Sequence, residues 1–426
     1  MERIYALMGL GPGDEGKGKI AGFLTDLLSG KLDPGKYNLS WRFQGGNNAG
    51  HTMISDDWSL QLSQIPSSIS NPKTHCFMGT GMFVTVRTLY NEIVSLHKKG
   101  LKITPKNFGI SSKAHVTLDY HVQDDQTAYN LTEHTSTGSG IKQTARDKMN
   151  RTGIRFVEFL DSYLMADILQ NRVFKDRGII KSVNYFKKMV DSYSKEREFL
   201  EEFVKLEHVV FKDPIYQFGV GEGAQGQVLC VDHGQYPGTS SSNPCFPTHR
   251  PDSTIGIIKA YNSSVGIGDR PFVAEMPESI QNKVREEWQE FGVRTGKPRH
   301  IGYMDLVALK YAADTAENDH LAITCLDRLE SLGRYNEDLN IVKAYKINGK
   351  VYDEWDLSFD RRDTLFNAEP IYEPLKTWTK TVDEKGNLTD NAQFYIDYIE
   401  QNVGKQFSLI GVGPKNSDTI VVNSIL

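Results

Sequence analysis

The sequence predicts an α/β protein with a largely parallel central sheet flanked by helices, and with subdomain insertions. The first observation is an apolar run at residues 4–8 that ends in a glycine-rich turn at residues 9–13. Apolar residues then follow at helical spacing from residue 17 to residue 28. The second observation is that similar apolar runs, each followed by a turn, recur along the chain. Alternating strands and helices are typical of a parallel sheet, which binds ligands at the carboxyl ends of its strands.

Further strands are predicted where short apolar runs precede glycine-rich or polar turns. The last of them is entered from a turn at residues 411–414. Residues 182–206 differ, because apolar pairs at i, i+3 and i+4 alternate with charges, which predicts one amphipathic surface helix with a scaffold role. The further predicted strands are 40–43, 209–211, 216–219, 321–324 and 418–422.

Composition predicts an ordinary soluble chain that can bury a large core. The chain has 426 residues, of which 39% are hydrophobic and 24% are charged. We find no Pro/Gly/Ser-rich linker, charge block or fixed-period repeat in it. We therefore expect one domain over residues 1–426, with insertions.

Charge and hydropathy exclude several classes of partner. The formal net charge is -5 and no Lys/Arg tract is present, so we expect no nucleic-acid partner. No apolar run approaches the ~20 residues that span a bilayer, and the first residues do not resemble a signal peptide. The four cysteines lack CxxC spacing, which fits reduced structural thiols. The expectation is a cytoplasmic protein with no membrane partner.

The first glycine-rich loop predicts an anion site. Gly11-x-Gly13-x-x-Gly16 matches a dinucleotide fingerprint, and Gly11-x4-Gly16-Lys17 is similar to a Walker A loop, but Gly18 stands where Walker A places Ser or Thr. Glycines let backbone N–H groups approach an anion that the lysines neutralise, at a helix N-terminus that favours negative charge. Asp14, inside this cationic loop, is either a functional carboxylate or only a helix N-cap.

The second cluster, Gln44-Gly-Gly-Asn-Asn-Ala-Gly-His-Thr52, is more specific. It places three glycines, three side-chain amides, a histidine and a threonine within nine residues. Such a density of donors and permissive backbone favours polyphosphate and metal binding over a core role. A purely structural role for His51 is correspondingly less favoured.

Together these segments resemble the paired signature of adenylosuccinate synthetases. The resemblance is carried by Gly13-Asp-Glu-Gly-Lys-Gly-Lys19 followed by the 44–52 cluster. Further matching motifs occur in order along the chain: Ser136-Thr-Gly138, Asp147-Lys-x-x-Arg151, Glu222-Gly-Ala-Gln-Gly226, Asp232-His-Gly-x-Tyr-Pro237, Ser241-Ser-Asn243, Thr295-Gly-x-x-Arg299, Leu326-Asp327 and Gly413-Pro414.

The resemblance implies a ligase that joins L-aspartate to the 6-position of a 6-oxopurine nucleoside monophosphate, driven by GTP or ATP. Asp14 would remove the N1 proton, and His51 would be the acid that stabilises the phosphoryl group passing to the 6-oxygen. Gln225 would contact the base. The resulting 6-phosphoryl intermediate would then be displaced by the aspartate amine.

The same resemblance implies the ligand sets and a homodimer, in which Arg151 reaches the monophosphate of the neighbouring subunit. Mg²⁺ would be held by Asp14 and the carbonyl of Gly50. The implied monophosphate set is Asn48, Ser136, Thr137, Arg151, Gln225 and Ser240, and the aspartate set is Thr295, Lys297 and Arg299. The implied triphosphate set is Glu15, Gly16, Lys17, Gly18, Gly50, His51, Thr52, Asp327, Gly413 and Pro414.

Departures from the family pattern bear on the substrate. Ser139 and Lys297 each replace a usual arginine, and the segments 142–146 and 244–247 differ beside the expected monophosphate pocket. They favour the phage-type branch, which uses dGMP to make the precursor of 2-aminoadenine DNA; the alternative is an ordinary enzyme that uses IMP. Thr324-Cys-Leu-Asp327 keeps the carboxylate for guanine and lacks the family lysine, so we expect GTP to be accepted with weakened discrimination against ATP.

Two other classes of protein remain as rivals. A nicotinamide dehydrogenase would explain the first loop, yet it leaves the 44–52 cluster and the 222–226 motif without a role. A non-catalytic nucleotide-binding module would bind the same ligands without releasing phosphate.

Overall fold

A ten-stranded sheet forms the centre of the molecule. The computed structural model describes residues 1–426 except 55–58, 132–136, 246, 265–270, 293–295 and 426. Neighbouring strands in the sheet are parallel, apart from the antiparallel pair β19 and β20. The predicted α/β class with a largely parallel sheet is confirmed. In sheet order the strands are β20 (Thr419–Val421), β19 (Phe407–Gly411), β15 (His320–Thr324), β11 (Ser253–Lys259), β1 (Arg3–Gly9), β10 (Tyr216–Glu222), β2 (Tyr37–Arg42), β5 (Thr74–Met78), β7 (Phe108–Ser111) and β9 (Val204–Lys205).

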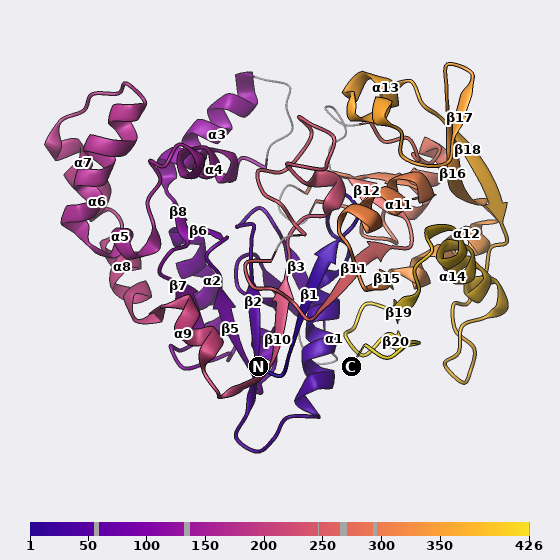
Figure 1. The fold of residues 1–426 in the computed structure, drawn as a ribbon, viewed down its shortest axis with the longest axis horizontal. Coiled ribbons are helices and arrows are strands. Elements are labelled where there is room, and N and C mark those ends of the chain that lie inside the picture. The colour runs from indigo at the N-terminus through magenta and orange to yellow at the C-terminus, as the bar shows by residue number, and fades with distance from the viewer. Residues whose placement is uncertain (55–58, 132–136, 246, 265–270, 293–295, 426) are drawn as a thin grey trace.

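Helices flank the sheet and fill the two sides of the molecule (Figure 1). Within the described residues, no helix is both long enough and apolar enough to cross a membrane. The α-helices are α1 (Lys17–Ser29), α2 (Val86–Lys98), α3 (Asp119–Leu131), α4 (Ile141–Met149), α5 (Phe156–Leu160), α6 (Ser162–Ile168), α7 (Val183–Asp191), α8 (Ser194–Leu200), α9 (Glu207–Lys212), α10 (Glu278–Val284), α11 (Leu306–Thr315), α12 (Glu330–Tyr335), α13 (Arg362–Phe366) and α14 (Asp390–Val403).

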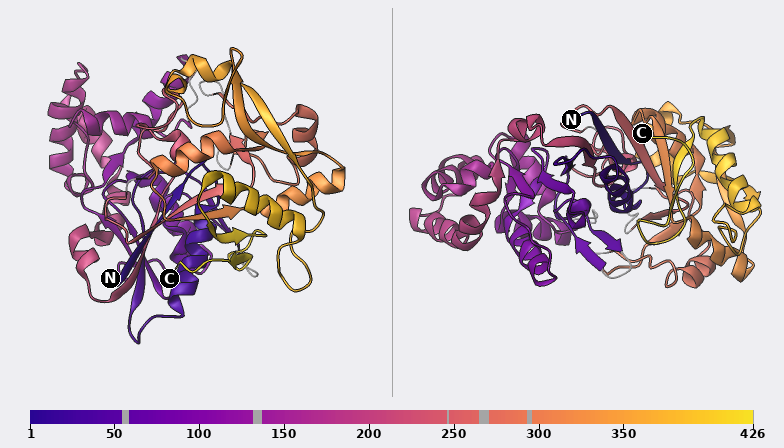
Figure 2. Two further views of the ribbon diagram at one scale, coloured as in Figure 1. Left: turned by 45° about the vertical axis from the view of Figure 1, so that its right-hand side comes forward. Right: turned by 90° about the horizontal axis from the view of Figure 1, so that it is seen from below.

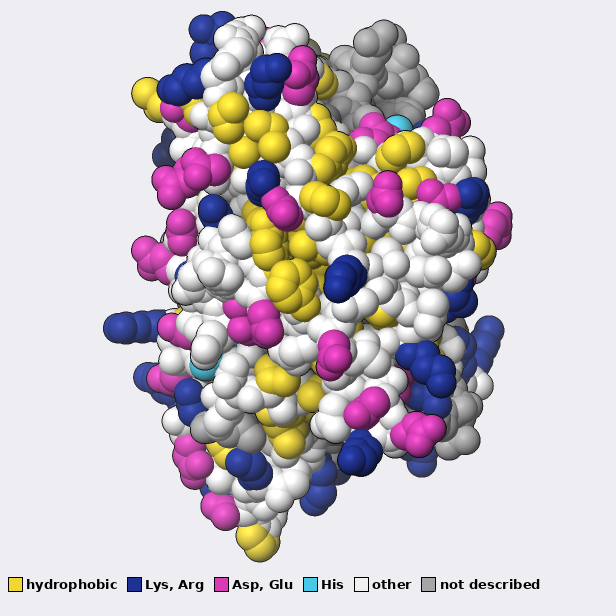
Figure 3. Space-filling model, turned by 90° about the vertical axis from the view of Figure 1, so that its right-hand side faces the viewer, with side chains coloured by type: hydrophobic (Ala, Val, Ile, Leu, Met, Phe, Trp, Pro, Cys, Tyr) yellow, Lys and Arg dark blue, Asp and Glu magenta, His cyan; other side chains and the backbone are white. Residues whose placement is uncertain are grey.

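Small sheets surround the large one. A hairpin, a parallel pair and an antiparallel pair lie beside it, and a four-stranded sheet lies on the C-terminal side. Figure 3 looks onto that side, where apolar side chains form a band between scattered charges of both signs. The additional strands are β3 (His51–Ile54) with β4 (Ser59–Leu62), β6 (Phe83–Thr85) with β8 (His115–Thr117), β12 (Asn262–Ser264) with β13 (His300–Gly302), and β14 (Met304–Asp305), β16 (Leu339–Ile347), β17 (Lys350–Tyr352) and β18 (Glu369–Leu375).

β1 and α1 form the predicted strand, turn and helix. Ile20, Leu24 and Leu28 recur every four residues of α1 and are fully buried. They share one apolar core with residues of β1, β10, β11 and β15, so this face of α1 packs on the sheet. Gly16 begins the helix in the left-handed conformation, with φ 79°, which glycine adopts without a steric penalty.

The predicted single helix over residues 182–206 is wrong in its extent. Two helices, α7 and α8, cover most of it, and the segment ends in β9, which pairs with β7 at the sheet edge. The helices break at Tyr193, whose ring is buried and whose hydroxyl accepts a hydrogen bond from the Asp119 backbone at 2.7 Å. Tertiary packing of this aromatic ring therefore overrides the helical periodicity. Figure 2 shows this part of the chain as separate short helices at one end of the molecule.

Residues 209–211, predicted as a strand, lie instead in α9. An apolar run of three residues fits either structure, and here only Val210 of the run is buried. The strands predicted at 40–43, 216–219, 321–324 and 418–422 correspond to β2, β10, β15 and β20. β10 is followed by a loop and a short 3-10 turn rather than by the expected helix.

Candidate active site

The polar motifs converge on one edge of the sheet. Each follows the carboxyl end of a strand, and parallel strands bring those ends together. Residues 10–16 follow β1, 43–50 follow β2, 223–226 follow β10, 325–327 follow β15 and 412–414 follow β19.

Two residues of this edge have unusual backbone conformations. Asp14 and Gln225 both have φ 59°, in the left-handed region that non-glycine residues seldom occupy. Such a conformation costs about 1 kcal/mol or more and persists only where the surroundings enforce it. Strain of this kind concentrates at functional sites, which supports the selection of these two residues.

Asp14 and Arg299 contact each other, although the sequence assigned them to different substrates. The second guanidinium nitrogen, Nη2, of Arg299 donates to Asp14 Oδ2, and Nη1 donates to Glu290 Oε2 at 2.8 Å. The Arg299 side chain is 6% exposed, whereas that of Asp14 is 37% exposed. The predicted base is therefore paired with the predicted carboxylate-binding arginine.

Glu290, which the sequence analysis missed, is the centre of a buried charge cluster. Its Oε1 accepts from Lys259 at 2.8 Å, from the Tyr261 hydroxyl at 2.5 Å and from Arg328 at 2.9 Å. Burial alone would raise the pKa of Glu290, but the charges of Lys259, Arg299 and Arg328 hold it well below its usual range. No sequence pattern linked these four segments, because only the fold brings them together.

His51 is held by a second buried carboxylate, Glu222. His51 Nδ1 lies 3.1 Å from Glu222 Oε1. The carboxylate also accepts from the Ser67 backbone at 2.9 Å and from the Ser67 hydroxyl at 2.8 Å. An ionised carboxylate only accepts hydrogen bonds, so we assign the imidazole proton to Nδ1 from this network. Glu222 is the first residue of the 222–226 motif, and that motif is the sequence signal from which this residue could have been selected.

The other imidazole nitrogen, Nε2, is buried and has no hydrogen-bond partner among the described residues. Burial, together with the charges of Arg42 and Lys17, lowers the pKa of His51 well below its usual value. These surroundings therefore favour the neutral ring at neutral pH. The predicted acid would need added negative charge nearby to become protonated.

The first loop is tied to two neighbouring loops. Lys17 pairs with Glu15, and Glu15 Oε1 accepts from the Gly13 backbone at 2.7 Å. Thr324 Oγ1 donates to the Glu15 carbonyl at 2.8 Å. Lys19 Nζ donates to the carbonyls of Gly413, at 2.5 Å, and Asp418, at 2.8 Å. Several predicted triphosphate residues thus lie together, with the two lysines engaged by the protein itself.

Gly18 permits the close approach of α1 to the His51 side. A Cβ at this position would lie 2.6 Å from Ser67 Oγ and 3.3 Å from His51 Nδ1. Any side chain at position 18 would displace the hydrogen-bond network that holds the imidazole.

The remaining predicted triphosphate residues lie at the same edge of the sheet but differ in exposure. Gly50 and Gly413 are partly buried, whereas Thr52 and Pro414 are exposed.

Cys325 and Asp327, which lie in the segment predicted to bind the base, follow β15. Cys325 has φ 60°, and it begins the short turn that carries Asp327. Burial raises the pKa of the Asp327 carboxyl, while the charges of Arg328 and Lys19 act in the opposite direction. The carboxylate that would read guanine is therefore half-buried beside cations.

The residues predicted to bind the monophosphate come from several separate segments of the chain. Asn48 Oδ1 and Gln225 Oε1 are buried and accept no hydrogen bond within the described part of the chain. Ser240 Oγ donates to the Ser242 carbonyl at 3.0 Å. Thr137 is exposed and its hydroxyl lies 2.6 Å from that of Ser139. Ser136 and Thr295 lie outside the described residues.

Arg151 and Lys297 are exposed. Arg151 follows α4 in the left-handed conformation, with φ 62°. Helix α4 packs on α3 and β8, on the side of the molecule formed by residues 83–200 (Figure 1). Lys297 lies just before Arg299, in a turn where its carbonyl accepts from the Gly292 backbone at 2.8 Å.

The two predicted metal ligands, Asp14 and Gly50, offer oxygen donors of the kind that Mg²⁺ binds. Asp14 offers a partly exposed carboxylate and Gly50 a backbone carbonyl, both hard oxygen donors. Among the described residues, no group of three or more His, Cys, Asp or Glu side chains could hold a metal. Mg²⁺ commonly binds through one or two carboxylates together with substrate phosphates, so these residues fit such a site.

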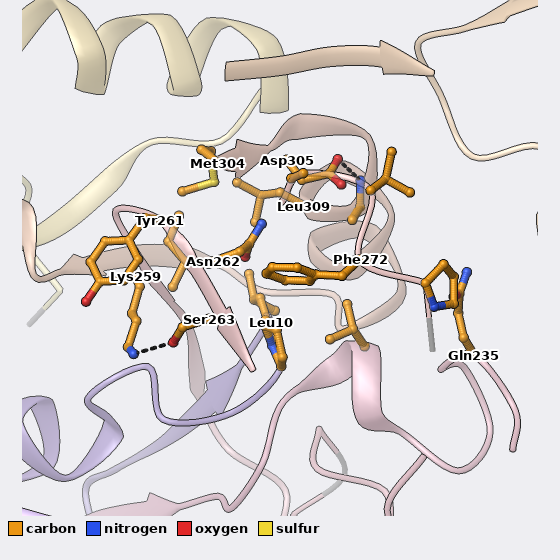
Figure 4. A pocket seen from close by; sticks show the side chains of 18 of the residues that line it. Leu10, Gln235, Lys259, Tyr261, Asn262, Ser263, Phe272, Met304, Asp305 and Leu309 are labelled. Carbon is orange, nitrogen blue, oxygen red and sulfur yellow. Dashed lines mark hydrogen bonds between the residues drawn. The ribbon is translucent and has the colours of Figure 1, made fainter. Parts of the chain in front are cut away.

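A pocket that the sequence did not indicate lies behind the first loop (Figure 4). Apolar side chains such as Leu10, Phe272 and Leu309 line it together with the backbone of residues 11–13. Asp305 also lines the pocket, and it accepts from the Tyr345 hydroxyl at 2.6 Å and the Ala308 backbone at 3.1 Å. Burial raises the pKa of Asp305 to about 6.

Comparisons with known proteins agree with this arrangement. A family model described as adenylosuccinate synthetase matches residues 6–420. The adenylosuccinate synthetase of Caldanaerobacter subterraneus is 33% identical and covers 99% of both chains. That of Borrelia recurrentis is 34% identical over 99% of this chain and 98% of its own.

Two solved structures are also similar. Fully ligated adenylosuccinate synthetase from Plasmodium falciparum has a TM-score of 0.84 at 25% identity, over 99% of this chain and 100% of that chain. A cyanophage S-2L succinoaminodeoxyadenylate synthetase, bound to dGMP and dATP, has a TM-score of 0.59 at 17% identity, over 100% of this chain and 96% of that chain, and so shows likeness of fold alone. From the family match and the full-length relatives, the chain belongs to the adenylosuccinate synthetase family and is a carbon–nitrogen ligase of that type.

Proposed function

We propose that the protein joins L-aspartate to C6 of a 6-oxopurine nucleoside monophosphate through a 6-phosphoryl intermediate. In the first step Asp14 takes the N1 proton, the 6-oxygen attacks the γ-phosphorus of GTP or ATP, and the nucleoside diphosphate leaves. In the second step the aspartate amine attacks C6, and the 6-oxygen leaves within inorganic phosphate. The observation that carries the proposal is that Asp14, bound by Arg299, follows β1, while Glu222, paired with His51, ends the adjacent parallel strand β10.

Arg299 links recognition of aspartate to activation of the base. The Arg299 guanidinium donates to Asp14 and so occupies one oxygen of the proposed base. A substrate carboxylate that binds the guanidinium competes for this contact and frees Asp14. Lys297 and the unplaced Thr295 complete the proposed aspartate set.

His51 and Glu222 would serve the transferring phosphoryl group. The negative charge of a bound triphosphate opposes the effects of burial and of Arg42 and Lys17, so it would raise the pKa of His51. Proton uptake at Nε2 would then convert a ring anchored through Nδ1 into a donor to the developing charge. Glu222 stabilises the resulting imidazolium.

Mg²⁺, when bound, would neutralise phosphate charge beside Asp14 and the Gly50 carbonyl. Lys17 and Lys19 would add positive charge in the same loop. Asp327 would accept hydrogen bonds from guanine. Since Cys325 stands where the family has a lysine, we propose that GTP is accepted with weakened discrimination against ATP.

We propose dGMP as the preferred monophosphate. Lys297 in place of an arginine removes a planar bidentate donor for a ribose 2′-hydroxyl. The 2-amino group of guanine brings two N–H donors, and leaving them unsatisfied on burial costs ~1–3 kcal/mol. The hydroxyls and carbonyls of residues 240–242, beside the altered segment 244–247, are the nearest candidates to accept them.

IMP is the second candidate, favoured by full-length identity of 33% and 34% to enzymes named adenylosuccinate synthetase. A panel of IMP, dIMP, GMP and dGMP, each with GTP and with ATP, separates the two. We expect the largest kcat/KM for dGMP, with GMP between dGMP and IMP or below both. Efficient conversion of IMP, with dGMP neither reacting nor competing, would assign the chain to the IMP enzymes.

We also propose that the active unit is a homodimer in which Arg151 serves the neighbouring site. Its exposure at the end of α4 leaves the side chain available to another subunit. Apolar side chains on the side of the molecule formed by residues 83–200 are exposed as well, including Met149 at 80%, Tyr163 at 89% and Ile180 at 95%. A second subunit that covers them would remove this apolar surface from water.

A further inference from the structure

Arg328 lies between two parts of the proposed active site. It follows Asp327, the proposed guanine contact, in the turn after β15. Its side chain does not simply extend toward solvent, since it is 29% exposed and its Nη1 donates to the Tyr261 hydroxyl at 2.6 Å and to Glu290 Oε1 at 2.9 Å. The family resemblance gave this arginine no role.

The carboxylate of Glu290 connects Arg328 to Arg299. The Glu290 side chain is fully buried, with one oxygen bound by Arg328, Lys259 and Tyr261 and the other bound by Arg299. A buried carboxylate shared in this way fixes the guanidinium of Arg299 at the point where it reaches Asp14. Arg328 therefore acts on the position of Arg299, and on the net charge around it, through Glu290.

We propose that Arg328 is a positioning residue for the amino-acid substrate, acting through Glu290 on Arg299. This inference rests on the proposed function, because it takes Arg299 as the group that binds a carboxylate of aspartate. It assigns the side chain to the aspartate site, although the neighbouring Asp327 belongs to the triphosphate site.

The charge balance of the cluster gives the physical reason. Three cations, Lys259, Arg299 and Arg328, face two carboxylates, Glu290 and Asp14, so the cluster carries an excess of one positive charge. Aspartate brings two carboxylates and needs that excess. Loss of the Arg328 charge leaves a neutral cluster. Glu290 then holds Arg299 more strongly, because fewer cations share its charge. A substrate carboxylate therefore draws Arg299 away from Asp14 less easily.

The test replaces Arg328 with a neutral side chain of similar length in the full-length enzyme. For Arg328→Met we expect the KM for aspartate to rise by roughly tenfold, the effect of losing one charge-assisted contact, while the KM for triphosphate stays within about twofold. Arg328→Lys keeps the charge and should restore most of the aspartate affinity. The matched control is Arg334→Met, which removes a nearby arginine paired with Glu287 and Glu330 on the surface and should change neither KM.

Other outcomes would overturn the inference. A rise in the KM for triphosphate with an unchanged KM for aspartate would place Arg328 in the triphosphate site. An equal loss in Arg328→Lys and Arg328→Met, or unchanged kinetics in both, would exclude an effect of charge through Glu290. Failure of the proposed function looks different, because the unmodified enzyme would then show no aspartate-dependent phosphate release with any monophosphate.

Discussion

Replacement of Glu222 by glutamine tests the orientation of His51. The carboxylate accepts three hydrogen bonds, one from the His51 ring at 3.1 Å and two from Ser67 at 2.8 and 2.9 Å. Glutamine keeps the shape but offers one acceptor oxygen and one amide that only donates. It cannot satisfy both the imidazole N–H and the Ser67 backbone N–H, and it cannot stabilise an imidazolium by charge.

The loss should appear mainly in kcat. A hydrogen bond to a charged group contributes about 2 kcal/mol. An equal loss in the transition state corresponds to a roughly 30-fold lower kcat. The KM for monophosphate should change little, because Glu222 contacts the ring and Ser67 rather than the proposed base or ribose positions. Phosphate release at saturating substrates measures the effect.

Glu92→Gln is the matched control. Glu92 also accepts hydrogen bonds from a serine backbone and hydroxyl, those of Ser63, each at 2.8 Å. The hydrogen bonds that Glu92 accepts come from residues 63–65, none of which is a catalytic candidate, so Glu92→Gln should lose similar stability with near-normal kcat. If folded Glu222→Gln retained kcat within about twofold of the unmodified enzyme, the reasoning on His51 would be refuted.

Three further predictions follow from the same account. Asp14→Asn should abolish turnover and leave monophosphate binding by calorimetry largely intact, because an amide cannot take the N1 proton; near-normal turnover would exclude Asp14 as the base. Inactive Arg151→Leu and Asp14→Asn proteins should regain activity when their subunits are exchanged, and proven exchange without recovery would argue against a shared site. Burial first, and then nearby cations, lower the pKa of His115 from 6.5 to about 4, so the unfolded chain takes up a proton first and the free energy of unfolding falls as pH drops from 6.5 toward 4. Urea unfolding should show a flatter fall for His115→Gln, and an unchanged pH dependence would contradict this assignment.

Local patterns in the sequence were sufficient to predict the strands and loops that carry the motifs. The sequences of β1, α1 and β10 have regularly spaced apolar residues, and glycines mark where these elements end. Tertiary contacts favour the same structures as these local patterns. The segment 182–206 was harder, because the buried ring of Tyr193 and the pairing of β9 are decided by packing rather than by periodicity.

The candidate site likewise contains residues that local sequence patterns select and residues that only the fold brings together. Asp14 and His51 lie within dense local motifs, so residue types and spacing were enough to select them. Glu290, Arg328 and the pair Lys259 and Tyr261 come from three separate segments, which meet only when the sheet and its flanking helices pack. Their polar side chains give no distinct signal in one sequence, because a buried charge cluster and a solvated surface have the same composition.

The 6-phosphoryl intermediate is tested most directly by following the purine 6-oxygen. The enzyme is supplied with dGMP or IMP labelled with ¹⁸O at the 6-position, together with aspartate, Mg²⁺ and GTP, and the released phosphate is analysed by mass spectrometry. The proposed mechanism predicts that each phosphate carries the labelled oxygen and that the succinyl product forms in equal amount. Phosphate that carries oxygen from water instead would mean that the triphosphate is simply hydrolysed, and would contradict transfer to the purine.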